Sequence, residues 1–231
     1  MRYYRIRHSL DSKVIGRKYP QIKQVLIPTT WDDPMFIQSY IGQKAPENVL
    51  LPTPILYKSS KITDLVSAST VGLSLSLLVS NRLKLLLQSS LSFGMQFFEI
   101  QLLANNGLEH SYSIVHSFNS GYCFLNFKDS EIGYYKQTGG SDLTQSINSS
   151  TSKDLEKEIS DYERYLANAS SLDKYLFIKR IEFDKQSGID FFALSYVHGG
   201  TGFFVSENLK NEIEAAGCTG IVFTEPNERY P

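Results

Sequence analysis

The chain has 231 residues, of which 42% are hydrophobic and 20% charged, with a formal net charge of −1. This composition supports one or two hydrophobic cores and excludes disordered and collagen-like classes, and no heptad repeat runs along the chain. Two cysteines, Cys123 and Cys218, are too few for a disulfide framework. We expect them to be small buried side chains in a reducing compartment. Residues 65–81 form a long uncharged run, which is serine-rich and shorter than a spanning helix of ~20 residues, so a cytoplasmic protein without membrane contact is expected.

Charge is distributed unevenly along the chain. Residues 1–100 carry 12 Lys and Arg against 6 Asp and Glu, whereas residues 101–231 carry 11 against 18. An anionic partner for the first part is one interpretation. The other is that the two parts neutralise each other across an internal interface, or that the charges are simply solvated. The near-neutral total is unlike that of nucleic-acid-binding domains, so no nucleic-acid partner is expected.

The first hundred residues predict strands, an irregular region and one helix. Residues 3–8 alternate in character and predict a strand, with basic side chains typical of a sheet edge. Residues 16–60 hold six of the eight prolines, which restricts them to short strands near 23–27 and 55–58. Residues 73–79 predict a strand. Ser80 then predicts a helix N-cap, because its hydroxyl can accept the free amides of the first turn.

The middle of the chain predicts a hairpin, a loop and a long helix. Residues 95–103 and 112–118 predict strands, and the turn at 119–121 predicts a returning strand at 122–127. Residues 137–152 are polar and predict a mobile loop or linker. In residues 153–168 the apolar side chains fall on one stripe, which predicts an amphipathic helix.

The C-terminal part predicts a hairpin and then a strand–helix–strand unit. Residues 175–184 predict a strand and residues 190–197 its returning partner, followed by a glycine-rich connection at 198–202. Residues 203–205 predict a short strand, Ser206 a second N-cap and residues 207–216 a helix. Gly217 suits the helix end, and residues 220–224 predict the last strand.

One pattern occurs twice. Residues 78–84 (LVSNRLK) match residues 204–210 (FVSENLK), and each runs from an apolar strand through a serine cap into a helix. Both duplication and convergence explain this match. We predict an α+β fold of two lobes, each a mostly antiparallel sheet with one or two helices. Residues 1–136 form the first lobe, 137–152 the linker and 153–231 the second lobe.

The closing run of residues 203–226 resembles a bacterial family, the DUF1629-type immunity proteins (the immunity protein 11 and 43 group) of polymorphic toxin systems. The family pattern joins an apolar pair, Val-Ser, a short helix with Leu-Lys, a G-x-T-G turn and an aromatic strand. The matching positions are Phe204, Val205, Ser206, Leu209, Lys210, Gly217, Thr219, Gly220 and Phe223. A second match covers Asp64, residues 77–87 with Ser80 and Leu83, residues 95–100 and Tyr112.

The resemblance implies a non-enzymatic protein that binds and neutralises a cognate toxin in the producing cell, without a cofactor or a metal. The partner-binding candidates are the acidic positions of the helix at 153–168, which would suit a basic toxin. They are Glu156, Glu158, Asp161 and Glu163. A merely solvated helix face explains the same charges. A small enzyme with scattered catalytic groups and a generic protein-interaction module remain the alternatives.

Patterns that indicate catalysis are weak. The run His198-Gly199-Gly200-Thr201-Gly202 is similar to an esterase oxyanion loop, but the chain has no G-x-S-x-G nucleophile motif. His110 and His116 would face one side of a strand, yet two histidines without a third ligand make a poor zinc site. Neither cysteine has a neighbouring histidine or base in the sequence that would activate it.

Overall fold

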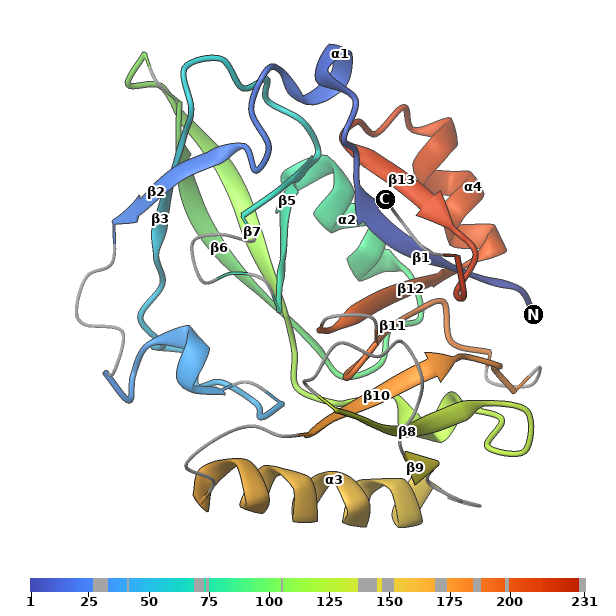
Figure 1. Ribbon diagram of the computed structural model, residues 1–231. Helices are drawn as coiled ribbons and strands as arrows, with labels where there is room; N and C mark the ends of the chain where they lie inside the picture. The colour runs from blue at the N-terminus through green and yellow to red at the C-terminus, as the bar shows by residue number, and fades with distance from the viewer. Residues whose placement is uncertain are drawn as a thin grey trace.

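The computed structural model describes residues 1–26, 33–40, 42–68, 73, 75–104, 106–136, 145–146, 152–168, 174–184, 188–197 and 200–228. Within these residues the strands form one six-stranded, one four-stranded and one three-stranded sheet, combined with helices (Figure 1). The prediction of a mixed α+β fold is confirmed. Trp31 and most of residues 137–152 lie outside the described residues.

The first of two related units occupies the middle of the chain. Its sheet runs in the order β4-β5-β7-β6, and helix α2 lies between β5 and β6 in sequence. The bounds are β4 (Leu65–Val66), β5 (Leu77–Ser80), α2 (Asn81–Ser89), β6 (Met95–Leu103) and β7 (Glu109–Ser117). The hydroxyl of Ser80 accepts a 3.3 Å hydrogen bond from the amide of Leu83, so the predicted N-cap is confirmed. Leu83 and Leu87 are fully buried and bind the helix to the sheet.

The second unit uses both ends of the chain. Its sheet runs in the order β11-β12-β1-β13, so the N-terminal strand lies between two C-terminal ones. The bounds are β1 (Tyr3–His8), β11 (Phe191–Leu194), β12 (Gly202–Ser206), α4 (Glu207–Ala215) and β13 (Ile221–Thr224). The prediction of an edge strand at residues 3–8 is wrong. Its basic residue Arg7 is not at a free edge but donates to the Thr224 hydroxyl and the Glu228 carbonyl.

The two units correspond residue by residue. From Thr63 to Glu99, each position of the first unit matches the position 126 residues later in the second, as Ser80 matches Ser206. Ser80 donates to Asp64 and Ser206 to Asp190, each over 2.6 Å and each to a carboxylate 16 residues earlier. Helices α2 and α4 have equal lengths and begin at matching positions. The duplicated sequence pattern is therefore a structural repeat.

Strand β1 takes the place that β7 holds in the first unit. Tyr112 of β7 lies opposite Ser80, and Tyr3 of β1 lies opposite Ser206. The Tyr112 hydroxyl donates to the carbonyl of Thr63 over 2.5 Å, and the Tyr3 hydroxyl donates to Ile189, the matching residue, over 2.8 Å. The second unit is thus a permuted copy, because its fourth strand comes from the opposite end of the chain.

The units share one core, in which matching residues meet. Val79, Leu83 and Leu87 of the first unit lie in a single buried cluster with their counterparts Val205, Leu209 and Ile213. The backbone contacts are reciprocal as well. The amide of Leu65 donates to the carbonyl of Thr219, and the amide of Phe93 donates to the carbonyl of Phe191. Phe191 is the counterpart of Leu65, and Thr219 is the counterpart of Phe93. Helices α2 and α4 lie side by side over this core (Figure 1).

The proline-rich region extends the first sheet. It contains α1 (Ser12–Ile15), β2 (Ile22–Leu26), a 3₁₀ helix η1 (Ile37–Tyr40) and β3 (Thr53–Leu56). Strand β3 pairs antiparallel with β2 and parallel with β6. Short strands near residues 23–27 and 55–58 were predicted, and the structure confirms them with shifted ends.

The third sheet and the long helix form a separate layer at the bottom of Figure 1. The bounds are β8 (Glu131–Lys136), β9 (Gln145–Ser146), α3 (Ser152–Asn168) and β10 (Lys174–Arg180). The predicted amphipathic helix is confirmed: Leu155, Ile159 and Tyr162 are buried in a cluster with residues of β8, β10 and the second unit.

Three local predictions are wrong. Residues 122–127 do not return as a strand but begin a 3₁₀ helix, η3 (Tyr122–Phe124), which buries Tyr122 and Phe124. Gly121 permits this, because its φ is +60° and an added Cβ would lie 2.4 Å from the Ala193 carbonyl oxygen. Strands β10 and β11 do not pair with each other, since β10 pairs with β8 and β11 with β12. Cys123 is exposed and Cys218 only partly buried, contrary to expectation.

The strand pairings run across the expected lobe boundary at residues 137–152. Strand β1 pairs with β12 and β13, and β8 pairs with β10. Strands before the boundary thus share sheets with strands that follow residue 153. The chain brings its two ends together in the second unit, which explains how a basic N-terminal strand and an acidic C-terminal region come into contact.

Candidate functional site

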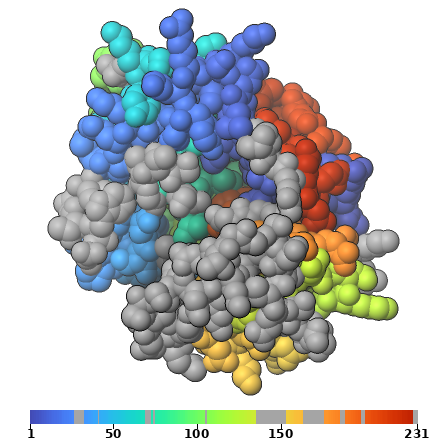
Figure 2. All heavy atoms as spheres, viewed as in Figure 1, coloured from blue at the N-terminus to red at the C-terminus, as the bar shows by residue number. Residues whose placement is uncertain are grey.

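Helix α3 carries the acidic residues that the sequence singles out. Glu156 and Asp161 are exposed, and Glu158 is half-buried. The Tyr134 hydroxyl donates to Glu158 over 3.4 Å, which ties that carboxylate to β8. The side chain of Glu163 lies outside the described residues. The helix forms the lower edge of the face in Figure 2, so its outer side faces solvent.

A groove of about 340 Å³ runs between α3 and the body of the molecule. Glu156, Ile159 and Ser160 form the helical wall. The other wall comes from four separate segments, at residues 42, 75, 120–122 and 195–201, and most of its side chains are hydroxyl-bearing or aromatic. These residues are Ser120, Tyr122, Ser195, Tyr196 and Thr201. Of all the residues that line the groove, sequence reasoning identified only Glu156 as a binding residue, because nothing in the sequence pattern shows that these segments meet.

Tyr196 is the one non-glycine residue in the described part of the chain with a positive φ, at 62°. Backbone of this kind is strained for a residue with a Cβ and often marks a functional position. The carbonyl of Tyr196 accepts a 2.9 Å hydrogen bond from the amide of Ile178, which holds the turn against β10. Its ring meets Tyr162 of α3 edge to face at 5.9 Å. The strained turn therefore sets an aromatic ring in the groove wall.

A smaller hollow of about 30 Å³ adjoins the groove and shares Ser195 and Thr201 with it. His116 forms part of its lining and is buried, with its Nε2 atom 2.8 Å from the carbonyl oxygen of Gln43. His110 lies six positions away on the same strand but is only partly buried. Over the part of the chain that the structure describes, no group of three or more His, Cys, Asp or Glu residues could hold a metal ion.

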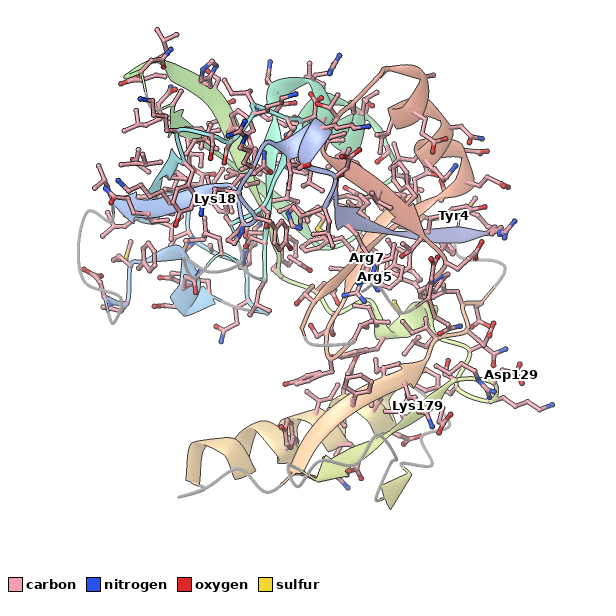
Figure 3. All side chains as sticks on the ribbon, turned by 45° about the horizontal axis from the view of Figure 1, so that its top comes forward. Tyr4, Arg5, Arg7, Lys18, Asp129 and Lys179 are labelled. Atoms are coloured by element: carbon pink, nitrogen blue, oxygen red, sulfur yellow. The ribbon has the colours of Figure 1, made fainter. Side chains whose placement is uncertain are left out.

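Arg5 is the most unusual charged residue of the second unit. It is 7% exposed, and its Nη2 donates a long hydrogen bond of 3.5 Å to the carbonyl oxygen of Val197. Its Nη1 has no hydrogen-bond partner among the described residues. Burial, assisted by the charge of Arg7, lowers the pKa of Arg5 to about 10. Figure 3 shows Arg5 and Arg7 on the side of β1 opposite Tyr4.

The groups considered for catalysis are not assembled into a site within the described residues. His198 and Gly199 of the glycine-rich run lie outside them, and Gly200 and Thr201 line the groove. Desolvation by neighbouring protein atoms raises the pKa of both thiols, at Cys123 and at Cys218, which disfavours their thiolate forms. Among the helices that the structure describes, none has the length and apolar character needed to cross a bilayer.

Comparison with known proteins adds no family to this geometry. No protein-family model matches the chain, and no curated protein matches it significantly. The features that bear on function are therefore the groove, the helix beside it and the sequence resemblance.

Proposed function

We propose that the chain is a non-enzymatic immunity protein, which binds a cognate bacterial toxin in the producing cell and blocks it. The observation that carries this proposal is the exposed carboxylate of Glu156 in the wall of the α3 groove. The resemblance of residues 203–226 and of the middle segment to DUF1629-type immunity proteins supports it independently.

The groove suits a basic side chain of a partner. The Glu156 carboxylate can pair with a lysine or an arginine of the partner. The remaining N–H groups of that side chain can donate to the hydroxyls of Ser160, Ser195 and Thr201. The side chains of Tyr122 and Tyr196 line the same groove and supply aromatic contacts beside the cation. Asp161 lies on the exposed side of α3 and adds negative charge that attracts a basic partner as it approaches.

The test is co-expression with the product of the neighbouring toxin-like gene, scored by growth and by co-purification. The wild-type chain should restore growth and form a one-to-one complex. Glu156→Lys should weaken that complex about tenfold or more, because it puts like charges together in the groove. Raising the salt concentration should weaken the wild-type complex more than the variant complex.

Glu212→Lys is the matched control, since Glu212 is exposed on α4, outside the groove lining. It makes the same change of charge and should leave the affinity within about twofold. Growth without a complex would overturn the proposal, as would the absence of both. Equal loss in the Glu156→Lys and Glu212→Lys variants would leave toxin binding in place but exclude the groove.

A further inference from the structure

A second hollow lies on the first unit, over the sheet face that carries α2. It has a volume of about 510 Å³. Its residues come from α2, β6, β7 and the segment before β3, and most of the side chains are polar. They include Asn81, Glu99, Gln101, Ser111 and Ser113, and we call this hollow the Ser113 trough. The side chain of Glu99 is 80% exposed, and its carboxylate accepts from Lys84 of α2 over 2.6 Å.

The second unit shows the same surface when larger side chains occupy it. The register of β1 makes Tyr4 the counterpart of Ser113, and Arg2 the counterpart of Ser111. Glu225 matches Glu99 and Lys210 matches Lys84. The two units thus have a charged frame of one lysine and one glutamate at matching positions, but Lys84 pairs with Glu99 whereas Lys210 pairs with Glu214. Where the first unit has two serines, the second has a ring and a cation, and that cation, Arg2, pairs with Glu225.

In the second unit the side chains of Arg2 and Tyr4 lie within the charged frame of Lys210 and Glu225. Arg2 pairs with Glu225 and lies 5.3 Å from the centre of the Tyr4 ring. The ammonium of Lys210 lies 5.1 Å from the same centre, so the ring contacts two cations. The Tyr4 hydroxyl donates to Glu207, the counterpart of Asn81, over 3.4 Å. Figure 3 shows Tyr4 on the α4 side of β1.

We propose that the Ser113 trough binds an extended segment of a partner protein that carries an arginine and a tyrosine two positions apart. The tyrosine ring covers Ser113 beside Lys84, as Tyr4 lies beside Lys210. The arginine pairs with the exposed carboxylate of Glu99, as Arg2 pairs with Glu225. The Glu99 carboxylate is exposed enough to accept from the arginine while it keeps its pair with Lys84, so it favours a basic over an acidic segment. The trough shares no residue with the α3 groove, and the proposal does not depend on toxin binding.

The sharpest variant fills the trough with the side chains of the second unit. Ser111→Arg/Ser113→Tyr should fold with an unchanged or raised melting temperature, because the frame around these positions already accommodates the same pair elsewhere in the molecule. Glu99→Gln is the second variant, since it removes the carboxylate and keeps the shape. Glu47→Gln, at an exposed position outside the trough lining, is its matched control.

The probe is the blocked peptide Gly-Arg-Ser-Tyr-Gly, titrated into the full chain and followed by amide chemical shifts. We expect saturable shifts at Asn81, Lys84 and Ser113, with a Kd of about 1 mM for so small a ligand. The filled variant should lose binding at least tenfold. Glu99→Gln should weaken the peptide several-fold, whereas Glu47→Gln should not, and replacing the peptide's arginine by glutamate should abolish the shifts.

Three results would overturn the proposal. One is the absence of shifts in the trough at 5 mM peptide, a concentration about fivefold above the expected Kd. Another is equal binding by the filled variant and the wild type. The third is a concentration-dependent dimer of the wild type that the filled variant lacks, because the occupant would then be a second copy of this chain. If the filled variant fails to fold, the Glu99→Gln and Glu47→Gln pair still decides the question.

Discussion

The backbone amide of Thr219 donates a 2.7 Å hydrogen bond to the carboxylate of Asp64, 155 residues earlier in the chain. The same carboxylate accepts from Ser80, the N-cap of α2, and from Arg82. Asp64 therefore fixes the start of the first unit's helix and the turn after the second unit's helix at one point. Burial alone would raise the pKa of Asp64, but the hydrogen bonds from Arg82, Ser80 and Thr219 outweigh it and hold that pKa at about 2.

This low pKa predicts a specific loss of stability in acid. A carboxylate with a folded-state pKa near 2 and an ordinary unfolded value of about 3.9 stabilises the protein fully above about pH 5. The contribution, of about 2 kcal/mol, is lost as the pH falls toward 2. Asp64→Asn should therefore cost about 2 kcal/mol at pH 7 and about half of that at pH 3. Urea unfolding between pH 7 and 3 measures the difference.

The control separates Asp64 from the other titrating groups. Burial lowers the pKa of His8 to about 4, so both proteins also lose stability between about pH 6.5 and 4 as the unfolded chain takes up that proton. Only the difference between wild type and variant reports on Asp64. The exposed Glu47→Gln variant should stay within about 0.5 kcal/mol of the wild type. A pH-independent cost for Asp64→Asn would contradict the account.

Removing either serine cap should destabilise the protein for the same reason, but by different amounts. Ser80→Ala and Ser206→Ala each remove the acceptor of a helix amide and the donor to an aspartate, at a cost of about 1 kcal/mol or more. Ser206 is fully buried and Ser80 is not, so the loss at Ser206 should be larger. Thermal or urea unfolding measures both. Ser89→Ala, at the exposed end of α2, should stay within about 0.5 kcal/mol, and a larger effect there would weaken the comparison.

Two glycines after α4 provide a test of close packing between the units. Gly217 and Gly220 both have positive φ values, of +65° and +81°. A Cβ on Gly217 would meet no atom within 4 Å, whereas one on Gly220 would lie 2.4 Å from the Leu65 carbonyl oxygen. Gly217→Ala should cost about 1 kcal/mol for its backbone alone. Gly220→Ala should cost at least about 2 kcal/mol more, and equal melting temperatures for the two variants would refute the close approach.

Local chemistry predicted the parts of the fold that depend on neighbouring residues. The helices at α2, α3 and α4 follow from serine caps and apolar spacing, and the strand β6 from its run of aromatic and aliphatic side chains. Pairing between distant strands was not predictable in this way. The basic residues of β1 predicted an edge strand. That prediction was wrong because nothing in the sequence of β1 shows that β12 and β13 lie on either side of it.

The candidate site was predictable only in part, for the same reason. The charges of α3 could be placed on one helix from their spacing. The groove beside it depends on Tyr122 and Tyr196, whose positions follow from a left-handed Gly121 and a strained turn. The repeated Ser-x-x-Leu-Lys pattern signalled the two units, and the matching aspartates 16 residues earlier could have strengthened that inference.

The repeat also predicts the effect of removing the buried charge at Arg5. Its counterpart in the first unit is Ile114, which is fully buried, whereas Arg5 buries a cation whose Nη1 is unpaired in the described structure. Replacing buried ion pairs by well-packed apolar residues is often neutral or stabilising by about 1–4 kcal/mol, because the desolvation cost of the charges is removed. Arg5→Ile should therefore raise the melting temperature, and Arg5→Lys, which keeps a charge with fewer donors, should lower it. A destabilised Arg5→Ile variant would show that the guanidinium stabilises this layer despite its unpaired nitrogen.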